Sequence, residues 1–143
     1  MKKASQIIVI EDDPDDRDFF EQAFREVGVM NPIRHFTTCI PAMEYLAVTT
    51  EQPFLIISDI NLPGISGLEM RRRIAANPYL KKKCIPFVFL STSNTKANVD
   101  EAYELSVQGY FEKPADFNEL KNFLKMIAEY WSVCLHPNDN LVK

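Results

Sequence analysis

Short apolar runs alternate with amphipathic stretches along almost the whole chain, and this alternation limits the possible folds more than any other feature. The apolar runs predict strands at residues 6–10, 33–36, 54–58, 85–90 and 109–112. The amphipathic stretches predict helices at residues 14–27, 41–48, 67–77, 96–106 and from about 115 to 131. Strands that alternate with helices form right-handed parallel crossovers. We therefore expect an α/β fold, a doubly wound five-stranded parallel sheet with helices on both faces.

The composition of each run predicts its place in the sheet. Residues 6–10, 54–58 and 85–90 are nearly all apolar, as buried central strands are. Residues 33–36 include Arg34 and His35, which suits an edge strand. The 143 residues are enough for one domain. We expect this domain over residues 1–131, with residues 132–143 as a C-terminal tail without a separate domain.

Charge and hydropathy argue against several classes of partner. The net charge of -4 disfavours direct nucleic-acid binding, which draws on a basic surface. Apolar runs stay far below the roughly 20 residues that cross a bilayer, so we expect no membrane association. The start of the sequence resembles no secretory signal, which predicts a cytoplasmic location.

Polar residues follow four of the apolar runs, at the point where each predicted strand ends. In chain order they are Glu11-Asp12-Asp13, Ser58-Asp59, Ser91-Thr92 and Lys113-Pro114. The carboxyl ends of neighbouring parallel strands form one crevice, so these side chains should meet there. Carboxylates held close together repel unless a cation lies among them, and Mg²⁺ suits such oxygen ligands. A metal ion, the ammonium of Lys113 and the hydroxyl of Ser91 would then surround one acceptor carboxylate. This arrangement predicts a binding site for a phosphoryl group.

With Leu62, Pro63 and Gly67 following Asp59, this pattern resembles the receiver domain of two-component response regulators. The resemblance covers residues from about 5 to 131. It implies a flavodoxin-like fold with strand order 2-1-3-4-5. It also implies a single-domain response regulator that accepts a phosphoryl group from a sensor histidine kinase, with Mg²⁺, and thereby switches protein–protein interactions.

The resemblance also implies roles for individual residues. Asp59 would be the phosphoacceptor. Lys113 would pair with Asp59 before the reaction and with the phosphoryl group after it, and Ser91 would donate a hydrogen bond to a phosphoryl oxygen. Tyr110 matches the aromatic residue that turns inward when Ser91 moves. Pro114 stands where the family commonly has a cis peptide bond.

A second set of implied roles concerns the metal. Asp12 and Asp59 would bind Mg²⁺ directly, with the backbone carbonyl of Asn61 as a further ligand, and Glu11 would act mostly through a metal-bound water. Asp12 with Asp13 is an alternative acidic pair, but Glu11 directly follows the apolar run and is preferred. The other acidic residues of this stretch are interpreted as residues that cap the next helix or complement its dipole: Asp13, Asp15, Asp16 and Asp18.

Other functions use the same residue types. A phosphorelay intermediate would have the same site but pass the phosphoryl group to a histidine phosphotransfer protein. A phosphohydrolase would need a second acid two residues after the nucleophile, where this chain has Asn61. We therefore expect a signalling phosphoacceptor with slow self-dephosphorylation rather than an enzyme. Since no output domain follows in this sequence, we expect it to act by binding a downstream protein, or a second copy through the last two strand–helix units.

Overall fold

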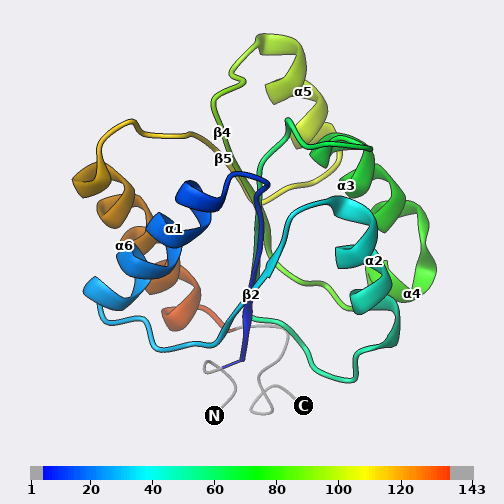
Figure 1. Cartoon of the computed structure of the whole chain (residues 1–143). Coiled ribbons are helices and arrows are strands. Elements are labelled where there is room, and N and C mark those ends of the chain that lie inside the picture. Colours follow the sequence, from blue (N-terminus) through cyan, green and yellow to red (C-terminus); the bar gives the residue numbers. More distant parts are fainter. Residues whose placement is uncertain (1–4, 136–143) are drawn as a thin grey trace.

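The structure is a computed structural model that describes residues 5–135, and within them the chain forms a five-stranded sheet (Figure 1). The strands are β1 (Ile7–Ile10), β2 (Ile33–Phe36), β3 (Leu55–Ser58), β4 (Phe87–Ser91) and β5 (Gly109–Glu112). Each strand runs parallel to its neighbours, in the order β2-β1-β3-β4-β5. The predicted fold class and strand order are confirmed, and β2 lies at an edge as expected.

Helices cover both faces of the sheet, as Figure 1 shows. One face carries α1 (Pro14–Glu26) and α6 (Phe117–Val133). The other carries α2 (Cys39–Val48), α3 (Gly67–Ala76), α4 (Pro78–Lys82) and α5 (Lys96–Glu104). Helix α6 continues two residues past the boundary expected at 131, and residues 136–143 of the expected tail lie outside the described residues. Among residues 5–135, no helix has the length and apolar character needed to cross a membrane.

Helix α4 was not predicted from the sequence. The Asn77 side chain caps it by accepting hydrogen bonds from the backbone N–H groups of Tyr79, at 3.0 Å, and Leu80, at 3.1 Å. Pro78 occupies its first position, where the missing N–H costs no hydrogen bond. Five residues are too few to show a helical repeat of apolar positions, so periodicity alone could not reveal this element.

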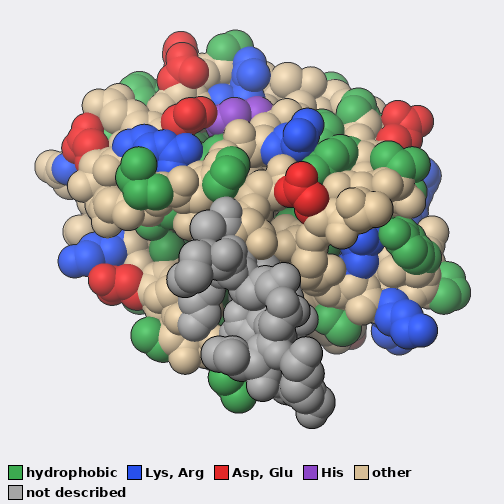
Figure 2. Space-filling view, turned by 90° about the horizontal axis from the view of Figure 1, so that it is seen from below, with side chains coloured by type: hydrophobic (Ala, Val, Ile, Leu, Met, Phe, Trp, Pro, Cys, Tyr) green, Lys and Arg blue, Asp and Glu red, His purple; other side chains and the backbone are tan. Residues whose placement is uncertain are grey.

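The molecule seen from the amino ends of the strands carries a mixture of side chains. Figure 2 shows acidic, basic and hydrophobic groups interspersed over this face. A surface for the phosphate backbone of nucleic acid would instead gather Lys and Arg on one face. The face in view therefore has no such basic concentration.

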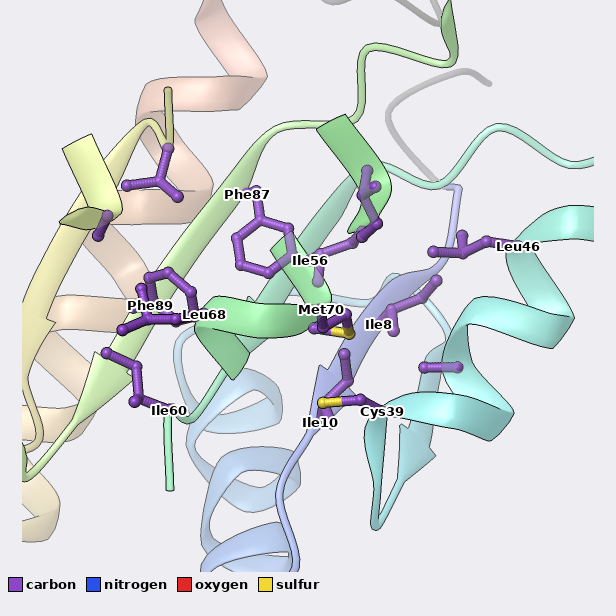
Figure 3. Close-up of a cluster of buried hydrophobic side chains, with 14 of the residues drawn as sticks. Ile8, Ile10, Cys39, Leu46, Ile56, Ile60, Leu68, Met70, Phe87 and Phe89 are labelled. Atoms are coloured by element: carbon purple, nitrogen blue, oxygen red, sulfur yellow. The ribbon is translucent and has the colours of Figure 1, made fainter. Parts of the chain in front are cut away.

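Two hydrophobic clusters, one on each side of the sheet, follow from the alternation of side chains along the strands. Toward α2, α3, α4 and α5 the strands contribute Ile8, Ile10, Ile56, Phe87 and Phe89 (Figure 3). Toward α1 and α6 they contribute Ile7, Val9, Leu55, Ile57, Val88 and Leu90. Burying each of these large side chains stabilises the fold by roughly 1.5–3 kcal/mol. The central strands are therefore held rigidly from both sides.

The strand register aligns the residues that follow each strand. Ile10 lies opposite Ser58, and the backbone N–H of Asp59 donates to the carbonyl of Ile10 at 3.1 Å. The N–H of Lys113 donates to the carbonyl of Ser91 at 2.8 Å. The backbones of Asp59 and Lys113 are thus fixed to neighbouring strands at the carboxyl edge of the sheet.

Candidate functional site

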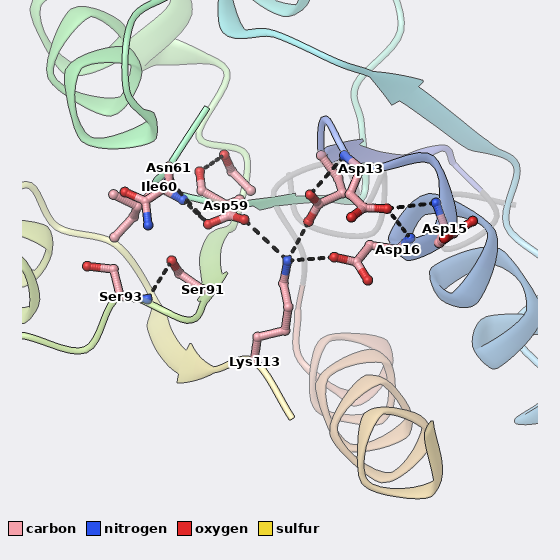
Figure 4. Close-up of polar contacts among 11 residues, drawn as sticks. Asp13, Asp15, Asp16, Asp59, Ile60, Asn61, Ser91, Ser93 and Lys113 are labelled. Carbon is pink, nitrogen blue, oxygen red and sulfur yellow. Dashed lines mark hydrogen bonds and ion pairs between the residues drawn. The ribbon is translucent and has the colours of Figure 1, made fainter. Parts of the chain in front are cut away.

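The ammonium group of Lys113 lies among three carboxylates at the carboxyl edge of the sheet (Figure 4). It donates to Glu11 Oε1 at 2.7 Å, to Asp16 Oδ2 at 3.2 Å and to Asp59 Oδ2 at 3.2 Å. The side chains of Glu11 and Asp59 are only 3% and 9% exposed, and that of Lys113 is 14% exposed. The structure therefore brings Asp59, Lys113 and Glu11 together in one buried cluster, as the sequence pattern led us to expect.

Burial and charge act in opposite directions on these groups. Burial by itself would lower the pKa of Lys113, but the hydrogen bond to Glu11 and the charges of the three carboxylates outweigh it and raise the pKa above its usual range. Burial also raises the pKa of Glu11, although the hydrogen bond and charge of Lys113 pull it down. Lys113 is therefore firmly protonated and balances part of the negative charge around it.

The carboxylate of Asp59 is oriented by the backbone that follows β3. Its Oδ1 accepts hydrogen bonds from the N–H groups of Ile60, at 2.6 Å, and Asn61, at 3.2 Å. Its Oδ2 faces Lys113. With one oxygen bonded to N–H groups and the other to an ammonium, the side chain is held in one orientation. The side chain of Asn61 is exposed, and its contact with Asp59 is made through its backbone.

Gly67 has a steric role beside Asp59. Its N–H donates to the carbonyl of Ile60 at 2.9 Å. A Cβ atom at this position would lie 2.2 Å from the backbone oxygen of Asp59, far inside van der Waals contact. Gly67 therefore lets the start of α3 approach the backbone of the candidate phosphoacceptor, which explains its place in the sequence pattern.

Ser91 and Tyr110 meet at one residue of the loop after β4. The Ser91 hydroxyl, fully buried, accepts a hydrogen bond from the N–H of Ser93 at 3.1 Å. The Tyr110 hydroxyl donates to the carbonyl of Ser93, and the Ser93 hydroxyl accepts from the side chain of Asn98 in α5 at 2.6 Å. Burial raises the pKa of Tyr110, and the negative charge of Asp59 raises it further. The hydrogen bond to Ser93 lowers the pKa but does not cancel the rise. Ser93 thus connects both predicted switch residues to α5, while their switching roles stay predictions.

The oxygen donors expected to bind Mg²⁺ have the right chemistry. Glu11 and Asp59 are buried and share one ammonium, so a single cation could contact both. Asp12 follows Glu11 in the chain, Asn61 lies two residues after Asp59, and both are exposed. Within residues 5–135, however, no three His, Cys, Asp or Glu side chains are arranged as a ready-made metal site. Mg²⁺ commonly uses one or two carboxylates together with water and phosphate oxygens, so the residues fit, and their roles as ligands stay predictions.

Two features of the site differ from the sequence-based expectation. Asp16, interpreted as a residue that complements the dipole of α1, also contacts Lys113. The sequence position of Asp16 could have indicated this contact. Asp16 is three residues after the Asp13 N-cap, and the side chains of a helix tilt toward its N-terminus. Among the described residues no peptide bond is cis, so the Lys113–Pro114 bond is trans.

Comparison with known proteins shows the family of this chain. A family model described as the response regulator receiver domain matches residues 7–125. The chain belongs to this family. Among curated relatives of this receiver, response regulator Rcp1 of Synechocystis sp. is 29% identical over 130 residues, which cover 87% of each chain. A probable methanogenesis regulatory protein, FilR2 of Methanothrix harundinacea, is 29% identical over 129 residues, covering 87% of this chain and 82% of FilR2.

Solved structures show the same likeness. The phosphorylated cyanobacterial phytochrome response regulator RcpA superposes on this receiver with a TM-score of 0.84 at 30% identity, covering 93% of this chain and 98% of RcpA. The Mn²⁺-bound form of Rcp1 has a TM-score of 0.80 at 27% identity, covering 92% of this chain and 96% of that one. Two structurally similar response regulators have thus been crystallised, one phosphorylated and one with a divalent metal.

Proposed function

We propose that this receiver accepts a phosphoryl group on Asp59 from a phosphorylated histidine of a sensor kinase and then changes the protein that it binds. The observation that carries the proposal is the oriented, buried Asp59 carboxylate beside the ammonium of Lys113. The phosphorylated structure of RcpA, a relative of similar fold, supports it.

The transfer needs little from the protein beyond position and charge. A carboxylate oxygen of Asp59 forms a bond to phosphorus while the P–N bond to the kinase histidine breaks, and the electron pair of that bond stays on the histidine nitrogen. The backbone N–H groups of Ile60 and Asn61 hold the carboxylate in place. Lys113 supplies a positive charge for the incoming phosphoryl oxygens.

Mg²⁺ is the proposed cofactor, held by Asp12, Asp59 and the carbonyl of Asn61, with Glu11 acting through a water molecule. When bound, it would neutralise phosphoryl charge and orient the oxygens for in-line displacement. The Mn²⁺-bound form of Rcp1 supports a divalent cation in this role.

The response is proposed to pass through the loop after β4. A phosphoryl group that draws the Ser91 hydroxyl toward itself would break the bond between Ser91 and the N–H of Ser93. Ser93 is also bonded to Tyr110 and to α5, which buries Ala102 and leaves most of its other side chains partly or fully exposed. Moving a population from 1% to 99% active takes about 5.5 kcal/mol. A few charge-assisted hydrogen bonds of about 1.5–3 kcal/mol each are enough to supply it.

The proposed partners follow from this reaction: a sensor histidine kinase upstream and a protein target downstream, with this receiver in the cytoplasm. As an alternative to a downstream protein target, a second copy of this chain would bind through α5, β5 and α6.

An end-point switch and a phosphorelay intermediate give different results in one assay. After phosphorylation, a relay protein loses its phosphoryl group rapidly to an added histidine phosphotransfer protein, whereas an end-point switch keeps it.

The direct test is incubation with acetyl phosphate and Mg²⁺ followed by intact mass spectrometry. We expect wild type to gain the mass of one phosphoryl group and Asp59→Asn to gain none. Asp100→Asn is a matched control, because Asp100 is an exposed aspartate paired with Lys96 away from the site. Equal phosphorylation of wild type and Asp59→Asn, or none of wild type, would contradict the proposal.

A further inference from the structure

The three N–H bonds of the Lys113 ammonium are matched by three carboxylate acceptors. Glu11, Asp16 and Asp59 each accept one hydrogen bond, at 2.7, 3.2 and 3.2 Å. An ammonium group has three donors and no acceptor. In this arrangement no N–H of Lys113 is free to bind an oxygen of an incoming phosphoryl group.

When Asp59 is phosphorylated, the N–H of Lys113 that faces it passes to the phosphoryl group. A second N–H of Lys113 can bind the phosphoryl group only if Glu11 or Asp16 releases the ammonium. Glu11 makes the shortest of the three contacts, and its side chain is 3% exposed, so it would be left buried and unpaired. Asp59 itself carries the phosphoryl group. Asp16 is 35% exposed, and its carboxylate can be solvated by water after release.

The surroundings of Asp16 give it room to move. Asp16 and Lys113 both line a cavity of about 370 Å³ between the start of α1 and the start of α6, next to Thr92. Glu11 and Asp59, in contrast, do not line this cavity. Asp16 is thus the carboxylate with both solvent access and space beside it.

We propose that Asp16 is a positioning residue that holds Lys113 in the unphosphorylated state and releases it when the phosphoryl group arrives. This inference rests on the proposed function of Asp59. Asp16 competes with the phosphoryl group for the same N–H of Lys113, and so it favours the unphosphorylated arrangement. The loss of its charge therefore strengthens the binding of a phosphoryl group or of a phosphoryl analogue.

The test is a beryllofluoride titration at saturating Mg²⁺, followed by amide NMR. We expect Asp16→Asn to be half-saturated at an about fivefold lower beryllofluoride concentration than wild type, which corresponds to one partly exposed ionic contact. Asp16→Glu, which keeps the charge, should stay close to wild type. The ¹⁵N signal of the Lys113 ammonium, recorded without beryllofluoride, should shift in Asp16→Asn because one acceptor has lost its charge.

Asp15→Asn is the matched control. Asp15 is the neighbouring aspartate in the first turn of α1, is exposed, and loses the same charge without a contact to Lys113. If Asp16→Asn and Asp15→Asn tighten beryllofluoride binding equally, the effect is one of net charge and the inference is wrong, although the proposed function stands. If wild type does not bind beryllofluoride at all, the proposed function itself fails.

Discussion

Replacing Lys113 by methionine should destabilise the protein strongly, because it removes the only ammonium that the described structure places among Glu11, Asp16 and Asp59. Methionine keeps much of the side-chain volume but carries no charge. The carboxylates of Glu11 and Asp59, 3% and 9% exposed, would then stay buried without a cation. Removing one partner from a buried ion pair costs about 3–5 kcal/mol.

Urea denaturation at pH 7, without divalent cations, measures this loss directly. We expect the free energy of unfolding to fall by about 3–5 kcal/mol with an unchanged denaturant slope. In a thermal scan the same loss lowers the melting temperature by on the order of 10 °C. The loss should shrink at acidic pH, since burial raises the pKa of Glu11 and the residue takes up a proton before an unperturbed glutamate does.

Lys121→Met provides the comparison that decides the reasoning. Lys121 pairs with Glu26 at 3.1 Å, but the two side chains are 27% and 41% exposed. A surface pair of this kind contributes about 1 kcal/mol or less. If Lys113→Met loses no more stability than Lys121→Met, burial does not make the Lys113 cluster dependent on its ammonium, and the electrostatic argument for the site is refuted.

Three further substitutions test other parts of the site. Burial raises the pKa of Glu11, so its ionisation disfavours the folded state. The contribution of Glu11 to stability should therefore be present below about pH 4.5 and be lost as pH rises through the raised pKa, and Glu11→Gln should lack this component in pH-dependent urea titrations. Tyr110→Phe removes the hydrogen bond to the Ser93 carbonyl and should lose about 0.5–1.5 kcal/mol, with faster amide hydrogen exchange in the loop before α5. Gly67→Ala places a Cβ 2.2 Å from the Asp59 oxygen and should lose about 2–3 kcal/mol in urea denaturation.

Each of these has a matched control. Glu26→Gln should change the pH dependence in the opposite sense, because surface hydrogen bonds lower the pKa of Glu26 and its contribution is lost as pH falls. Tyr103→Phe, at an exposed position of α5, should leave exchange unchanged. At Gly64, where φ is +81° and nothing lies within 4 Å of an added Cβ, alanine should lose only about 1 kcal/mol through backbone strain. Equal losses at Gly64 and Gly67 would show that contact with the Asp59 carbonyl is unimportant.

Much of the fold could be predicted because its determinants are local. The apolar content of 6–10, 54–58 and 85–90 predicted buried strands, and polar residues in 33–36 predicted the edge strand that β2 forms. Helix α4 was missed because five residues carry no periodic pattern, although Asn77 and Pro78 mark its start. Helix α2 begins at Cys39 rather than at 41, since a proline in the first turn interrupts no hydrogen bond.

The residue types at the ends of the strands follow from the sequence, because a strand is a local run and the residue after it is read directly. Which of those side chains touch depends on the tertiary structure. Lys113 and Glu11 are separated by 102 residues, and their contact depends on how β1, β3 and β5 are ordered in the sheet. The contact between Lys113 and Asp16 likewise joins segments that are 97 residues apart. Such contacts between distant segments are set by packing of the whole domain, and no short stretch of sequence encodes them.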